Sequence, residues 1–144
     1  MGRRGFTMIE MALVFTIIAI MAATAIPRIG RIMQSNRVNS VISTIASDME
    51  QAFSISARFR RPMRISCDCA NGIYTVADVA GGTVRLRRAV VGDQDLGNMT
   101  LTFDATVDVF PRGVSTAPLT VRITSGTSTR GVTLSTAGQV RIVP

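Results

Sequence analysis

The stretch RGFTMIE, residues 4–10, decides how this chain folds. It opens a long apolar segment that runs to Ile26 and carries, beyond Glu10, only two polar side chains, Thr16 and Thr24. A helix of about 20 predominantly apolar residues is long enough to span a bilayer. A carboxylate at the head of such a segment costs about 2.5–3.5 kcal/mol in hydrocarbon. Glu10 therefore predicts a functional role and a positively charged partner.

Composition excludes most enzyme chemistry. The chain has 144 residues and a formal net charge of +7, from 16 basic residues that are all arginine and 9 acidic ones. Without histidine or lysine it lacks the bases that activate a serine or cysteine nucleophile. Two cysteines are too few for a four-thiolate zinc site. We therefore predict a non-enzymatic protein with no metal and no cofactor.

Three interpretations of the N-terminus are open on residue pattern alone. The segment is a membrane anchor that stays, or a conventional export signal with a cleavage site at 23–25, or a twin-arginine signal that begins at Arg3 and Arg4. Glu10 argues against both signals, because their apolar regions avoid charge. The helical pattern also continues well beyond residue 25, which favours the anchor. An exported soluble β protein with a cleaved signal stays as an alternative.

The segment Gly5 to Glu10, followed by an apolar run that ends at Pro27, resembles the class III signal of type IV pilins and type II secretion pseudopilins. The resemblance implies that prepilin peptidase removes the leader, residues 1–5, between Gly5 and Phe6. It further implies N-methylation of Phe6. Residues 6–27 would be a transmembrane and then filament-core helix, with Pro27 at the position of a kinking proline.

Cleavage would give Glu10 its partner. It creates an ammonium at Phe6, four residues away on the same helical face. In apolar surroundings each charge needs the other. In the family, this glutamate is thought to pair with the amine of an adjacent subunit and to set its register. The resemblance thus implies an inner-membrane single-pass protein that joins an extracytoplasmic filament in the periplasm or at the cell surface. Its partners would be prepilin peptidase, other subunits and the inner-membrane assembly platform.

Residues 28–61 continue the helix with one apolar face. Apolar side chains recur at steps of four and three residues, in the order Val38, Ile42, Ile45, Met49 and Ala52. This spacing predicts a stripe that packs on the protein's own sheet. The helix is expected to end near Arg61, because the residue before Pro62 is driven out of helical geometry.

Residues 62–144 read as an antiparallel β domain of about eight strands, so the fold class is α+β. Short β-branched runs alternate with glycine and proline turns, at 63–69, 73–78, 83–91, 99–103, 107–110, 119–124, 132–135 and 139–143. Asn71-Gly72 marks a tight hairpin. A long helix followed only by strands resembles the GspH and FimT group of minor pilins and pseudopilins. The resemblance predicts a structural subunit of a type IV pilus or a type II secretion pseudopilus.

Cys67 and Cys69 lie one residue apart on a predicted strand, with both side chains on one face. Their expected Cα separation is at the edge of disulfide geometry, so a bridge between them needs a local kink. A strained disulfide, an inter-subunit bridge and two free thiols all stay open.

Arginine clusters raise a second function, because an arginine-rich surface binds phosphate backbones without reading sequence. FimT-like minor pilins include DNA-uptake proteins with a C-terminal Gly-Arg-x-Arg motif. Gly138 and Arg141 match that motif, and Gln139 replaces its first arginine. DNA binding in natural transformation is therefore an alternative function, with Arg122 and Arg130 as further contacts.

Overall fold

The computed structural model describes residues 7–90 and 99–144, without the side chains of 24–29 and 31. It forms two compact units, which divide between Ser35 and Asn36 and are described separately. The predicted cleavage site at Gly5 and Phe6 lies outside the described residues.

The first unit is helical. Helix α1 extends over Met8–Phe59 and continues through Pro27 into the second unit. Along 8–23 its apolar side chains are exposed all round the helix. Among the residues that the structure describes, no helix is long and apolar enough to cross a membrane, so the span predicted at 6–27 stays a prediction.

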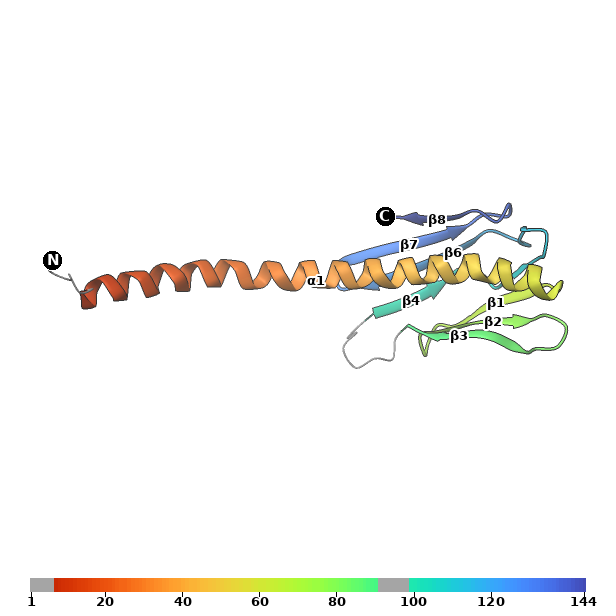
Figure 1. Cartoon of the computed structure of the whole chain (residues 1–144), viewed down its shortest axis with the longest axis horizontal. Coiled ribbons are helices and arrows are strands. Elements are labelled where there is room, and N and C mark those ends of the chain that lie inside the picture. The colour runs from red at the N-terminus through yellow and green to blue at the C-terminus, as the bar shows by residue number, and fades with distance from the viewer. Residues whose placement is uncertain (1–6, 91–98) are drawn as a thin grey trace, which may run out of the picture. The chain divides into compact units, whose positions relative to one another are not determined.

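The second unit packs the rest of α1 against two four-stranded antiparallel sheets (Figure 1). Sheet A has the order β3-β2-β1-β5, with β1 at Met63–Asp68, β2 at Ile73–Asp78, β3 at Val84–Ala89 and β5 at Val107–Val109. Sheet B has the order β4-β6-β7-β8, with β4 at Met99–Phe103, β6 at Leu119–Ser125, β7 at Ser128–Leu134 and β8 at Val140–Val143. The predicted α+β class is confirmed, but the strands form two sheets rather than one.

The predicted helical stripe is the centre of the core. Its five members, Val38, Ile42, Ile45, Met49 and Ala52, are all buried. They pack with buried side chains from both sheets, among them Ile65 and Leu119. Burying each large aliphatic side chain contributes about 1.5–3 kcal/mol. The second half of α1 is therefore the element that joins the two sheets.

Helix α1 ends at Phe59, two residues before the predicted end. The N–H of Arg60 donates to the carbonyl of Ala57, and that of Arg61 donates to the carbonyl of Ser56, which is the Schellman pattern. Arg60 holds the left-handed position of this motif, with φ of 54°. Glycine is the usual residue there because it has no Cβ to clash.

The strand boundaries agree with the sequence prediction to within two residues except for β7, which starts at Ser128 instead of residue 132. Ser125 pairs with Ser128, which leaves a two-residue turn at Gly126 and Thr127. Gly126 supplies the positive φ that such hairpin turns require. The Ser, Thr and Gly residues of this segment read as a loop in the sequence, and cross-strand pairing with β6 overrides that preference.

Candidate functional site

Thr7 and Glu10 are the described residues of the N-terminal motif. The N–H of Glu10 donates to Thr7 Oγ1 at 3.3 Å, and the N–H of Thr7 donates to Glu10 Oε2 at 3.5 Å. This reciprocal pair is a capping box, which satisfies N–H groups that the first helical turn leaves free. The spacing Thr-x-x-Glu is the sequence signal of a capping box, and the capping box was not predicted from it. The carboxylate of Glu10 is thus directed toward the N-terminal end of α1, whereas its pairing with the Phe6 amine stays a prediction.

A buried polar cluster ties α1 to sheet A. Asp48 accepts a hydrogen bond from the hydroxyl of Tyr74 on β2. It also accepts two from Arg88 on β3, from Nε at 2.5 Å and from Nη2 at 2.9 Å. The side chain of Asp48 is only 5% exposed, and the whole of residue Tyr74 is 2% exposed. This cluster was not predicted from the sequence, although Asp48 interrupts the buried stripe beside Met49.

The pKa of Tyr74 is raised above its ordinary value, first by burial and then by the hydrogen bond to Asp48. In the unfolded chain the phenol ionises near pH 10. The folded state therefore holds more protons than the unfolded state above pH 10. This contribution to stability is complete below pH 10 and is lost as the pH rises beyond it.

Alkaline titration tests this conclusion, because Tyr74 is the single tyrosine of the chain. We expect tyrosinate absorbance to appear only together with loss of secondary structure, and the chain in denaturant to titrate near pH 10. Half-ionisation near pH 10 in a chain whose circular dichroism is still native would contradict the buried hydrogen bond.

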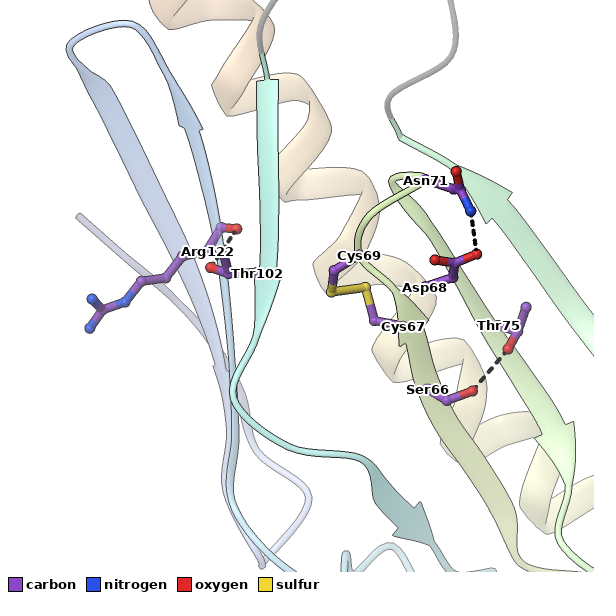
Figure 2. The surroundings of a disulfide bond; sticks show 8 residues. All are labelled: Ser66, Cys67, Asp68, Cys69, Asn71, Thr75, Thr102 and Arg122. Atoms are coloured by element: carbon purple, nitrogen blue, oxygen red, sulfur yellow. Dashed lines mark hydrogen bonds between the residues drawn. A yellow bond between two sulfur atoms is a disulfide. The ribbon is translucent and has the colours of Figure 1, made fainter.

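Cys67 and Cys69 form a disulfide, with their Cα atoms 5.1 Å apart (Figure 2). A regular strand would separate these atoms by about 6.6 Å. The local departure from strand geometry that bridging requires is present, because β1 ends at Asp68 and Cys69 begins a turn. In the same turn Asn71 donates a hydrogen bond to the Asp68 carboxylate at 2.7 Å. The disulfide thus closes a three-residue loop where β1 leads into the hairpin turn, and the structure holds no free thiol in its described residues.

The four residues considered for DNA binding do not form one surface. Arg122 pairs across the sheet with Gly131, and Arg141 pairs with Thr133, so the register places both arginines on the outer face of sheet B. Figure 2 shows the side chain of Arg122 projecting away from the strands. Arg130 instead lies opposite Ile123, which is fully buried, so it belongs to the other face.

Gly138 has a packing role. Its φ is +77°, and a Cβ added there would lie 2.1 Å from the carbonyl oxygen of Gly113 and 3.5 Å from the ring of Phe53. Contacts below 3.0 Å are essentially never seen for a real Cβ. The glycine that matches the DNA-uptake motif is thus required by the fold, and this match is no evidence for a DNA contact.

Among described residues, no group of three histidine, cysteine or acidic side chains could hold a metal ion.

Comparison with known proteins points to one class. Residues 1–26 match the family model for the prokaryotic N-terminal methylation motif. The fold is similar to the type IV minor pilin FimU of Pseudomonas aeruginosa, at 16% identity and a TM-score of 0.61 over 76% of this chain and 90% of that one. A second crystal form of FimU gives 15% identity and 0.57 over 74% and 92%. The minor pseudopilin EpsH of Vibrio cholerae aligns at 15% identity and 0.47 over 71% and 95%. No curated protein matches the chain significantly.

The chain therefore combines a prepilin-type methylation motif with the fold of a type IV minor pilin. The predicted N-terminal motif and the predicted pilin-like fold are confirmed, and neither the soluble export alternative nor the DNA-uptake alternative is favoured.

Proposed function

We propose that this chain is a non-enzymatic minor subunit of the GspH and FimT kind, assembled into a type IV pilus or a type II secretion pseudopilus. One observation carries the proposal: a methylation motif at residues 1–26 occurs in the same chain as a head domain with the minor pilin fold. A soluble domain would not use such a motif. A subunit that must leave a membrane and enter a filament needs it.

Processing comes first in this proposal. Prepilin peptidase removes residues 1–5, and Phe6 becomes an N-methylated terminus. The apolar run up to Ile26 holds the subunit in the inner membrane as a single span, with the head domain on the extracytoplasmic side. The disulfide between Cys67 and Cys69 is compatible with that compartment, because disulfides persist in oxidising surroundings.

Assembly follows, and Glu10 directs it. A carboxylate and an ammonium in apolar surroundings are each strongly destabilised alone and stabilised as a pair. The capping box between Thr7 and Glu10 fixes the carboxylate at the end of α1 where an incoming amine would bind. The exposed apolar side chains along 8–23 then pack against other subunits in the filament core.

The mass of the mature N-terminus tests the processing step. We expect chain purified from its native membrane to begin at Phe6 and to carry one methyl group on that amine. A Gly5→Val variant should keep residues 1–5, while a Gly30→Ala variant, changed outside the motif, should be processed normally. A mature chain that begins at Ile26 would show a conventional signal peptidase and refute the proposal.

A further inference from the structure

The C-terminal end of α1 carries an arginine cluster that the fold does not neutralise. The guanidinium carbon of Arg85 lies 4.1 Å from the centre of the Phe59 ring, and that of Arg58 lies 5.8 Å from it. Arg60 follows directly in sequence and is exposed. We call Arg58, Arg60 and Arg85, together with Phe59, the Phe59 arginine cluster.

Three arginines near the cluster form ion pairs, whereas those of the cluster form none in the described part of the chain. Three ion pairs join neighbouring strands and the helix: Arg61 with Asp78, Arg64 with Asp108, and Arg88 with Asp48. Within 7–90 and 99–144, the structure gives Arg58, Arg60 and Arg85 no ion pair. A guanidinium stacked by one face on an aromatic ring keeps the N–H groups at its edge for a carboxylate.

Arg60 adds a second observation. It occupies the left-handed position that ends α1, where glycine is the default residue. A residue other than glycine at such a position costs backbone energy, and positions of this kind cluster at functional sites. The position carries an arginine although the local backbone favours glycine.

We infer that the Phe59 arginine cluster docks on an acidic patch of a different pilin-like subunit. A second copy of this chain does not fit, because its described carboxylates are mostly engaged. Three are in the ion pairs above, and three others accept hydrogen bonds within the chain, at Glu10, Asp68 and Asp104. After loss of residues 1–5 the chain has 14 arginines against 9 acidic side chains, so copies would also repel. This inference rests on the proposed function and names the chemistry of the neighbour.

Photo-crosslinking in cells that carry the native machine tests the docking. Val84 is 51% exposed and precedes Arg85, so a photoreactive residue placed there reports on whatever covers the cluster. We expect an adduct with another processed pilin-like subunit, mapped to a segment rich in aspartate or glutamate. The double variant Arg58→Glu/Arg85→Glu should lower the adduct yield at least tenfold, because close charge pairs at interfaces contribute more than about 1.5 kcal/mol. Reversing the mapped carboxylates to arginine should restore it.

The matched control is Arg122→Glu/Arg141→Glu, which reverses two exposed arginines on the outer face of sheet B. Its adduct yield should stay within about twofold of the parent, as expected for charges outside the contact. A milder pair, Arg58→Gln/Arg85→Gln, should act in the same direction as the glutamates without placing acids beside Phe59.

Four results would overturn the inference: an adduct with a copy of this chain, an adduct with nucleic acid, a yield unaffected by charge reversal, or no adduct from a chain that enters filaments. Leader cleavage and the amount of subunit in sheared filaments are measured in the same cells. A chain that is neither cleaved nor incorporated refutes the proposed function itself, so the two failures are distinct.

Discussion

Replacing Asp48 with alanine should lower the free energy of unfolding by about 1–3 kcal/mol, the range found when a buried hydrogen-bonding group loses its partner. The Arg88 side chain is 43% exposed, so water can solvate its guanidinium in the variant. The change leaves the hydroxyl of Tyr74 and the guanidinium of Arg88 without their acceptor. Tyr74 is almost wholly buried, so solvent cannot replace the lost hydrogen bond. Denaturant unfolding, followed by circular dichroism, measures the difference.

Glu50→Ala is the matched control, because Glu50 is an acidic residue two positions along the same helix and is exposed. We expect a change within about 0.5 kcal/mol for that variant. A triple variant, Asp48→Leu/Tyr74→Phe/Arg88→Leu, should recover most of the loss, because replacing all partners of a hydrogen-bonded group with apolar groups of similar shape is often nearly neutral. A loss below 1 kcal/mol in Asp48→Ala would mean that the cluster does not hold α1 on sheet A.

Replacing Glu10 with alanine should nearly abolish incorporation into filaments and leave leader cleavage intact. Without the carboxylate, an incoming or neighbouring Phe6 ammonium is left unpaired in apolar surroundings. An unpaired buried charge costs about 3–5 kcal/mol, which corresponds to a decrease of at least roughly 100-fold. The measurement is the ratio of subunit in sheared filaments to subunit in membranes, with the mature N-terminus checked by mass.

Glu10→Gln separates the two roles of this side chain. Glutamine can keep the capping box, because its side chain oxygen still accepts from the N–H of Thr7, but it has no charge. We therefore expect Glu10→Gln to fail in assembly like the alanine variant, while Glu50→Ala assembles normally. Assembly of Glu10→Gln at the parent level would assign Glu10 to helix capping alone.

Much of the fold could be read from local pattern, because each signal acts over a few residues. The apolar stripe of α1 and seven strands follow from spacing and turn residues, and the structure places them as predicted. The errors occur where pairing overrides local preference. β7 includes four residues that read as a loop. A register shift between Val76 and Ala77 leaves Arg85 without a paired residue on β2.

The sequence by itself determined the N-terminal motif, since the methylation motif at residues 1–26 is defined by covalent order alone. Tertiary structure decided which arginines form ion pairs within the chain and which do not. Asp48, Asp78 and Asp108 meet their arginines across 17 to 44 positions of sequence, a separation that no local pattern encodes. Once those ion pairs have formed, the arginines of the Phe59 arginine cluster remain without an acidic partner in the described residues. Whether a charge is available therefore depends on which partners the fold brings within reach.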